Sequence, residues 1–233
     1  MCPTLTSPSP EQVFVVIAAY NEAKSIGEVL SRLHPRWPNI VVVDDGSQDD
    51  TANIAAANAA TVIRHPVNLG QGAAIQTGMR FALSRDAQYI VTFDADGQHV
   101  AGDIETLLEY QRRHGTKVVL GSRFLGSTVG MPYAKRVLLK AAVFFTRLST
   151  GLQLTDAHNG LRLFVHSAAA ALRIRQNRMA HASEILEQIS MLKLTYVEAP
   201  VTVVYTEYSK AKGQRMTNTI SILLELFMGR LIK

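Results

Sequence analysis

The chain has 233 residues, of which 47% are hydrophobic and 18% charged, and its formal net charge is +5. This length and composition are typical of one globular domain and exclude a disordered or fibrous protein. Because Cys2 is the only cysteine, an intramolecular disulfide is excluded and the sequence favours a cytoplasmic protein. We expect a loose tail at residues 1–12, a main domain at residues 13–215 and an amphipathic helix at residues 216–233.

Charge is divided unevenly along the chain. Residues 1–100 carry 6 Lys/Arg and 10 Asp/Glu, whereas residues 101–233 carry 18 and 9. Basic residues interrupt the apolar run at residues 137–148, which predicts an amphipathic helix on a membrane surface rather than an element that reads nucleic acid bases. The alternative is that this helix, like the one at residues 216–233, only covers the core. No run reaches the ~18 apolar residues of a membrane-spanning helix, so we expect peripheral docking or a membrane-protein partner.

Five apolar runs typical of buried strands alternate with helical patterns. They lie at residues 13–18, 39–44, 61–64, 88–94 and 117–121. Between the first two, residues 26–33 have the apolar spacing of a helix, and Ser25 and Glu28 have the spacing of a capping box. Strands that alternate with helices predict an α/β domain with a mostly parallel sheet flanked by helices.

The pattern changes after residue 156. A short strand is expected at residues 161–165, a helix at residues 183–192 and a further strand at residues 196–205. In that last run alternate residues are apolar, and Pro200 indicates an edge strand because proline cannot donate a ladder hydrogen bond.

Acidic residues follow two of the expected strands. Asp94 and Asp96 end one apolar run and are followed by Gln98, and in an extended chain alternate side chains point the same way. Asp44 ends another run, and the carboxyl ends of strands line the ligand crevice of an open α/β sheet. The pattern predicts a Mg²⁺ or Mn²⁺ site for a phosphorylated substrate, and the alternative is a strand that ends in a polar turn.

Six motifs carry a resemblance to a known family. They are Ala18-Ala19-Tyr20-Asn21-Glu22, Asp44-Asp45-Gly46-Ser47, Asn68-Leu69-Gly70-Gln71-Gly72, Asp94-Ala95-Asp96-Gly97-Gln98, Gly121-Ser122-Arg123-Phe124 and Asp156-Ala157-His158-Asn159-Gly160-Leu161-Arg162. On these motifs the chain resembles the family 2 glycosyltransferases, and within them the dolichyl-phosphate mannose synthase-like branch. The resemblance covers about residues 13–214. It implies the GT-A fold, an α/β domain that binds a nucleotide sugar.

The resemblance implies that the first strands hold the nucleotide of a UDP or GDP sugar. Asp44 and Glu22 would hydrogen-bond the base, beside which Tyr20 packs. An alternative role for the two acids is to cap the helices that follow. The other expected contact positions are Ala18, where the family usually has proline, Val42 and Ala95.

The resemblance also implies how the diphosphate leaves. Asp94 would bridge the ribose and the metal region. Asp96 and Gln98 would hold Mg²⁺ or Mn²⁺, which stabilises the negative charge that develops on the leaving diphosphate. The expected reaction is therefore an inverting, metal-dependent glycosyl transfer.

Basic residues of the second half match the acceptor side of the family. By resemblance Arg123 and Arg136 contact the phosphate of a polyprenyl phosphate at the inner face of the cell membrane, and Arg162 adds a second guanidinium near the metal. Lys210 and Lys212 resemble a late basic loop that closes over the diphosphate. The residues expected to carry the reaction are Asp96, Arg123, Asp156 and Arg162.

A sugar hydroxyl in cell-envelope polysaccharide assembly is the alternative acceptor. It would need a general base, for which Asp156, His158 and Glu184 are candidates. The Gln-x-x-Arg-Trp sequence of processive synthases is absent, which argues against polymer synthesis. Gly70-x-Gly72 lacks the third glycine of a dinucleotide fingerprint, which argues against a dehydrogenase. A non-catalytic nucleotide-binding module would share most of these residues, but the intact set of metal ligands argues against it.

Overall fold

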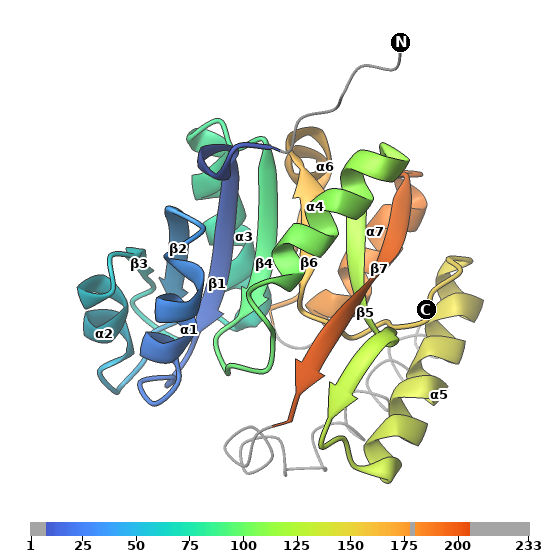
Figure 1. Ribbon diagram of the computed structural model, residues 1–233, viewed down its shortest axis with the longest axis horizontal. Coiled ribbons are helices and arrows are strands. Elements are labelled where there is room, and N and C mark those ends of the chain that lie inside the picture. The colour runs from blue at the N-terminus through green and yellow to red at the C-terminus, as the bar shows by residue number, and fades with distance from the viewer. Residues whose placement is uncertain (1–7, 178–179, 206–233) are drawn as a thin grey trace.

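The computed structural model describes residues 8–177 and 180–205, and one seven-stranded sheet runs through this part of the chain (Figure 1). The strand order is β3-β2-β1-β4-β6-β5-β7. The strands are β1 Val13–Ala19, β2 Asn39–Asp44, β3 Thr61–Arg64, β4 Tyr89–Asp94, β5 Val118–Val129, β6 Arg162–Val165 and β7 Tyr196–Val204. All seven expected strands form, and β7 lies at an edge as Pro200 indicated.

The sheet is parallel except for β6. This strand pairs antiparallel with both β4 and β5, and every other neighbouring pair is parallel. The mostly parallel α/β sheet predicted from the sequence is therefore confirmed. Because β6 runs against its neighbours, the loop before it, at residues 156–161, lies at the carboxyl end of β4 and beside Gly121 of β5.

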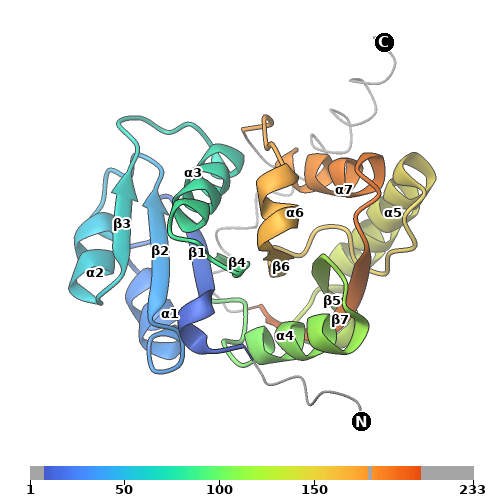
Figure 2. The ribbon, with the colours of Figure 1, turned by 90° about the horizontal axis from the view of Figure 1, so that it is seen from above.

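Helices cover both faces of the sheet (Figure 2). One core lies under α1, α2 and α4, and the other lies under α3, α5, α6 and α7. The helices are α1 Ile26–Leu33, α2 Thr51–Ala57, α3 Gln71–Ser84, α4 Asp103–His114, α5 Tyr133–Thr150, α6 His166–Ala171 and α7 His181–Met191, and a short 3-10 helix precedes β1 at Pro10–Gln12. The buried faces of the helices follow their apolar spacing, as in α1 with Ile26, Val29, Leu30 and Leu33.

The predicted capping box at the start of α1 is wrong. Ser25 has helical backbone angles, and its hydroxyl donates to Glu22 Oε2 at 2.9 Å instead of capping the helix. Glu28 pairs with Arg32 on the exposed face. The spacing alone could not show this, because the chain already turns at Glu22, whose carbonyl accepts the amide N–H groups of Ser25 and Ile26.

One expected strand is longer than predicted, and some expected elements lie outside the described residues. The strand expected at residues 117–121 continues to Val129, with a register shift against β7 between Ser122 and Ser127. Lys210, Lys212 and the helix expected at residues 216–233 lie outside the described residues, as does most of the expected tail. In the ranges described, no helix combines the length and apolar character needed to cross a membrane.

Candidate active site

The acidic residues predicted at the strand ends lie on both sides of β1. In the sheet register Ala19 pairs with Asp44 of β2, and Ala18 pairs with Asp94 of β4. Ala18 therefore lies between the two acidic strand ends. Because β1, β2 and β4 are parallel, their carboxyl ends form one edge, at which these side chains meet a ligand from the same side.

The Asp94 carboxylate is held by His99 and by Gln71, the first residue of α3. Its Oδ2 lies 2.9 Å from His99 Nε2, and its Oδ1 accepts a long hydrogen bond of 3.4 Å from Gln71 Nε2. Burial raises the pKa of Asp94, but the His99 hydrogen bond and the charges of His99, His181 and Arg162 outweigh this effect and hold the pKa below its ordinary value. Asp94 therefore stays ionised at neutral pH.

The glycine before β6 lets the 156–161 loop touch Asp94. A Cβ atom on Gly160 would lie 2.3 Å from Asp94 Oδ2, and the Gly160 carbonyl accepts from Thr92 Oγ1 at 2.6 Å. No side chain fits in this space. The close approach brings the motif that begins at Asp156 against the carboxylates of β4.

The pKa of Asp96 is shifted in the opposite direction from that of Asp94. Burial and the negative charge of Asp94 raise its pKa to about 6, and the Gln98 amide N–H, which donates to Asp96 Oδ1 at 3.0 Å, opposes the shift. Two carboxylates that raise each other's energy in this way fit a hard divalent cation, which would offset the repulsion. Within the described ranges no three His, Cys, Asp or Glu side chains cluster as a metal cage, so a cation here needs further ligands from an amide, water or substrate.

A cavity of about 530 Å³ lies beside this edge, at the ends of β1, β2 and β3. Its lining residues are Tyr20, Gly46, Ser47, Gln48, Arg64, His65, Pro66, Val67 and Asn68. The Asp44 carboxylate is fully buried, accepts the Ser47 amide N–H at 3.1 Å through Oδ1, and has Arg64 Nε 3.1 Å from its Oδ2. It therefore does not cap α2, whose N-cap residue is Asp50.

Not every donor-site position lies where a ligand can touch its side chain. Tyr20 is 40% exposed and lines the cavity, and Glu22 is buried with its carboxylate on the Ser25 hydroxyl. Val42 and Ala95 have their side chains buried in the core under α1 and α4, and the contact expected at these two positions stays a prediction. Their place in the core follows from the alternation of side chains along β2 and beyond β4.

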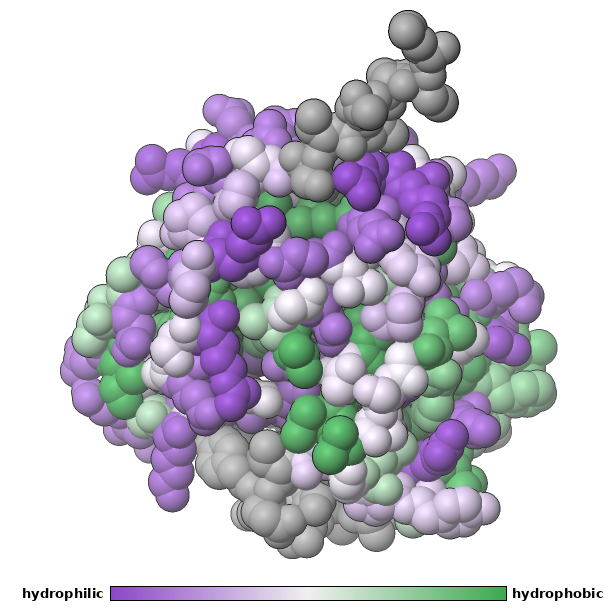
Figure 3. All heavy atoms as spheres, in the orientation of Figure 1, coloured by the Kyte–Doolittle hydropathy of each residue, from purple (hydrophilic) through white to green (hydrophobic). Residues whose placement is uncertain are grey.

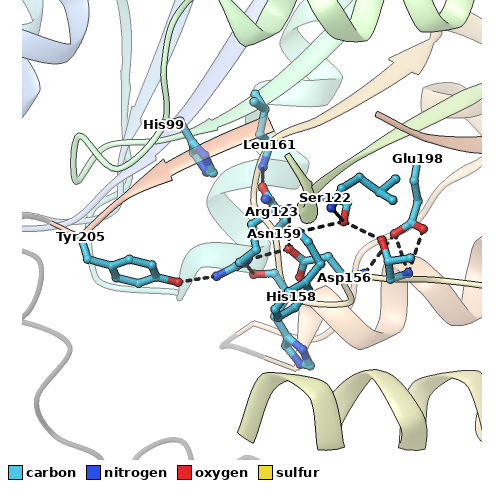
Figure 4. Close-up of polar contacts among 12 residues, drawn as sticks. His99, Ser122, Arg123, Asp156, His158, Asn159, Leu161, Glu198 and Tyr205 are labelled. Atoms are coloured by element: carbon cyan, nitrogen blue, oxygen red, sulfur yellow. Dashed lines mark hydrogen bonds and ion pairs between the residues drawn. The ribbon is translucent and has the colours of Figure 1, made fainter. Parts of the chain in front are cut away.

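Arg123 lies inside a network of the protein's own groups (Figure 4). Its Nε donates to Asp156 Oδ2 at 2.6 Å, one terminal nitrogen donates to Tyr205 Oη at 2.8 Å, and the other donates to the His158 carbonyl at 2.8 Å. The arginine is only 7% exposed. Burial lowers its pKa, but Asp156 and Tyr205 more than compensate and raise it. This geometry favours a role in holding the loop rather than the phosphate contact expected from the sequence.

Asp156 is committed to the same network. Its side chain has no exposed surface, and it also accepts the amide N–H groups of Arg123 at 3.1 Å and His158 at 3.2 Å. Glu198 of β7 accepts the amide N–H groups of Thr155 and Asp156 at 2.8 and 3.0 Å. The carboxylate of Asp156 thus anchors the loop, and this geometry does not favour a role as general base.

The other two candidates for a general base are His158, which is poorly basic, and Glu184, which is held in hydrogen bonds. Burial, with help from the charge of Arg162, lowers the pKa of His158 to about 4. Glu184 of α7 accepts the amide N–H groups of Arg175 and Gln176 at 2.9 and 2.8 Å. It therefore holds the segment before α7.

Arg162 is buried within electrostatic reach of both Asp94 and Asp156. It is 4% exposed, and its Nε donates to the Asn159 carbonyl at 2.9 Å. Burial lowers its pKa to about 10, while the charges of Asp94 and Asp156 act in the opposite direction. Its position fits neutralisation of these carboxylates.

The sequence singled out Arg136, but the neighbouring lysine faces the site. Arg136 is exposed, whereas Lys135 is half-buried with its Nζ 4.6 Å from the centre of the Tyr205 ring. Burial and the charge of Arg123 lower the pKa of Lys135, and Asp96 opposes this. Lys135 therefore lies close enough to both Arg123 and Asp96 to feel their charges.

Three residues of the site were missed as functional candidates. They are His99, Lys135 and Tyr205. His99 stacks edge-on to Phe93 and directly follows Gln98, so its place beside the acidic motif was a usable signal. Tyr205 was noted only as an apolar strand position, and no spacing in the sequence links it to Arg123, which is 82 residues away.

The fold and the site together define a nucleotide-sugar glycosyltransferase of the GT-A class. The sequence profile described as Glycosyl transferase family 2 matches residues 14–173. The chain belongs to this family, and it is a glycosyltransferase. The GT-A fold expected from the resemblance is confirmed.

Similar proteins agree with this assignment. The chain is 34% identical to the UDP-N-acetylglucosamine–dolichyl-phosphate N-acetylglucosaminyltransferase of Methanococcus voltae, over 95% of this chain and 97% of the relative. It is 30% identical to the undecaprenyl-phosphate mannosyltransferase of Micrococcus luteus, over 86% and 87%. The fold matches glucosyl-3-phosphoglycerate synthase of Mycobacterium tuberculosis, in complex with Mn²⁺ and UDP-glucose, with a TM-score of 0.65 at 19% identity over 82% and 69%. The first two relatives confirm the resemblance to the polyprenyl-phosphate branch, and the third shows the fold.

Proposed function

We propose that this glycosyltransferase moves a sugar from a nucleoside diphosphate sugar to a polyprenyl phosphate, with inversion at the anomeric carbon. An oxygen of the acceptor phosphate forms a bond to the anomeric carbon as the bond from that carbon to the diphosphate breaks. The nucleoside diphosphate leaves with the electron pair. The relatives named for dolichyl and undecaprenyl phosphate support this acceptor class.

One observation carries the choice of a phosphate over a hydroxyl acceptor. None of the three candidate bases is suited to take a proton: Asp156 is buried in hydrogen bonds, Glu184 holds backbone N–H groups and the pKa of His158 is about 4. A sugar hydroxyl needs a base, whereas a phosphate monoester is already anionic near neutral pH. The site therefore suits a nucleophile that brings its own negative charge.

On the donor side, we infer that the base enters the cavity lined by Tyr20 and Arg64. Asp44 does not line the cavity, but it pairs with Arg64, which does. If Arg64 turned toward the nucleotide, the Asp44 oxygens would suit the ring N–H groups of uracil and of guanine alike. UDP and GDP sugars both fit this chemistry.

Asp94 and Asp96, with Gln98 beside them, are the residues that would hold Mg²⁺ or Mn²⁺. The raised pKa of Asp96 supports this assignment, because a cation would stabilise the ionised form. When bound, the cation supplies positive charge against the leaving diphosphate. Arg162 holds the 159–161 backbone in place and adds buried positive charge close to Asp94.

On the acceptor side, we infer that Lys135 contacts the acceptor phosphate. It is half-buried on the first turn of α5, stacks on Tyr205 and lies within electrostatic reach of Asp96. Lys212, expected to close over the diphosphate, remains part of this proposal from the sequence.

The outer face of α5 fits a lipid surface. Tyr133, Val137, Phe144 and Leu148 share one face and are 82, 51, 64 and 76% exposed. Figure 3 shows apolar side chains at the right-hand edge, over α5. Lys140 and Arg147 lie on the same helix and suit anionic lipid headgroups. We propose that the enzyme docks peripherally at the inner face of the cell membrane, directly or beside a membrane-protein partner, with Lys135 turned toward the acceptor.

The test is transfer by the purified full chain to a polyprenyl phosphate in detergent, from UDP and GDP sugars with Mg²⁺ or Mn²⁺. Lys135→Met should raise the KM for the acceptor about tenfold or more and leave nucleotide affinity nearly unchanged. Lys117→Met, an exposed lysine at the start of β5, is the matched control. Transfer to a soluble sugar hydroxyl without transfer to the lipid phosphate would refute the proposal, and binding of nucleotide without any transfer would favour a non-catalytic module.

A further inference from the structure

The acidic motif at the end of β2 has a second carboxylate that the proposed reaction does not use. Asp45 is 2% exposed, and its two oxygens accept three N–H donors. Oδ1 accepts the Leu69 amide N–H at 3.0 Å and lies 2.8 Å from His65 Nδ1, and Oδ2 accepts the Gly70 amide N–H at 2.7 Å. One side chain thus ties the end of β2 to the whole 65–70 segment.

His65 is fixed at its other nitrogen as well. Its Nε2 lies 3.0 Å from Thr77 Oγ1, in the second turn of α3, and its amide N–H donates to the Asp44 carbonyl at 2.9 Å. The ring therefore links the end of β3 to α3 through Asp45 and Thr77. A histidine held at both nitrogens in this way fixes the loop that follows it.

The segment that this pair holds is the outer wall of the donor cavity. His65, Pro66, Val67 and Asn68 line the cavity, as Tyr20 does. This wall also packs closely against the loop after β2. A Cβ atom on Gly46, whose φ is +74°, would lie 2.6 Å from the Val67 carbonyl carbon. Val67 is 58% exposed, so its side chain is not held by packing in the core.

The same anchor reaches the catalytic carboxylates. Gly70, bound to Asp45, is the N-cap residue of α3, and Gln71 begins that helix and donates to Asp94 Oδ1. The start of α3 therefore has one fixed point at the base cavity and one at the proposed metal site.

We propose that Asp45 and His65 are positioning residues that preform the wall of the donor pocket and so set the affinity for the nucleotide. This inference rests on the proposed donor function. The physical reason is that a loop already ordered loses little conformational entropy when the nucleotide binds, whereas a released loop must be ordered at that moment.

The two test variants differ in severity. Asp45→Asn keeps the size of the side chain but turns one acceptor into an NH₂ group, which then faces an N–H donor. We expect the Kd for the nucleotide to rise about tenfold or more. Thr77→Val removes only the partner of His65 Nε2, and we expect a rise of about threefold. Should Asp45→Asn fail to fold, Thr77→Val still decides the question.

The measurement is calorimetric binding of UDP and of GDP with Mn²⁺ to the full chain, together with the KM values of donor and acceptor. The donor KM should follow the Kd while the acceptor KM stays within about twofold, a split that general loss of structure would not give. His166→Gln is the matched control, because its Nδ1 lies 2.9 Å from the Ala87 carbonyl at the opposite end of the sheet.

Unchanged nucleotide affinity in folded Asp45→Asn and Thr77→Val, with normal binding by the wild type, would overturn the inference alone. A parallel rise of donor and acceptor KM would also overturn it. If the wild type bound neither UDP nor GDP, the proposed donor function would fail, and this inference with it.

Discussion

The proposed donor half and the proposed acceptor half of the site use charge in different ways. At the ends of β2 and β4 the carboxylates of Asp44, Asp94 and Asp96 meet at one edge of the sheet, beside an open cavity. In the other half, Arg123 of β5 and Asp156 of the loop before β6 pair with each other and with backbone groups. In the proposed function Asp94 and Asp96 present their charge to a cation, whereas Arg123 and Asp156 hold the protein's own loop.

This difference shows why a charged motif need not be a contact motif. In the sequence Arg123 follows an apolar run, as Asp44 and Asp94 do, so the two halves have the same appearance. In the structure Arg123 is 7% exposed, whereas Tyr20 beside the donor cavity is 40% exposed. On the proposed acceptor side, Lys135 in the first turn of α5 lies within electrostatic reach of Arg123 and Asp96.

The largest expected effect would break the frame of the acceptor half. Arg123→Ala leaves the Asp156 carboxylate buried without its partner, so we expect the free energy of unfolding to fall by about 3–5 kcal/mol. Urea unfolding measures it. Arg113→Ala is the control, because Arg113 pairs with Glu109 on the surface, and it should change stability by less than about 1 kcal/mol. A stable Arg123→Ala protein that binds nucleotide but transfers no sugar would instead support a direct phosphate contact.

The donor half should behave in the opposite way. Asp96→Asn removes a carboxylate whose pKa is raised to about 6, so its ionised form weakens folding at pH 8 and its loss should not lower the melting temperature. Turnover should fall by about 10²–10³-fold, and metal-dependent nucleotide binding should weaken with it. Kinetics and calorimetry measure both. Glu109→Gln serves as the control, and equal turnover in Asp96→Asn would remove Asp96 from the site.

A smaller effect concerns pH and the acceptor loop. His158 has a pKa of about 4 in the folded protein, below the ordinary value of 6.5, so the unfolded chain binds more protons between these values. The contribution of His158 to stability is therefore present above pH 6.5 and is lost as the pH falls toward 4, by about 2–3 kcal/mol.

The measurement compares the wild type with His158→Asn between pH 7 and pH 5. The wild type should lose more stability over this range than the variant does. The exposed His34 offers a matched substitution, His34→Asn, which should leave the pH profile of the wild type nearly unchanged. Identical profiles for the wild type and His158→Asn would contradict the burial of this ring.

The smallest expected effect tests the proposed contact between α5 and the membrane. Phe144→Ser combined with Leu148→Ser should weaken binding to vesicles that contain anionic lipid by about tenfold or more, because two exposed apolar side chains no longer enter the bilayer surface. Sedimentation with vesicles measures it. Met191→Ser with Leu192→Ser changes two exposed apolar residues near the end of α7 and should have no effect. Equal losses in both pairs would argue against a docking surface on α5.

The sequence by itself determined the strands, most helices and the donor carboxylates. Strand positions could be predicted because runs of apolar residues flanked by helical patterns have few other folded arrangements. Asp44 and Asp94 could be placed because they directly end such runs, and parallel strands bring their ends to one edge. These are local patterns whose spatial result follows from the fold class.

Only the tertiary structure decided the acceptor half. Neighbouring residues on a helix point about 100° apart, so the docking of α5 determined that Lys135 rather than Arg136 faces Asp96. Arg123 meets Tyr205 because the extended β5 pairs with β7, and that contact joins residues 82 positions apart. The sequence does not show whether a charged side chain will contact a ligand or pair with a buried carboxylate. That depends on how deeply the side chain is buried and on partners from distant segments of the chain.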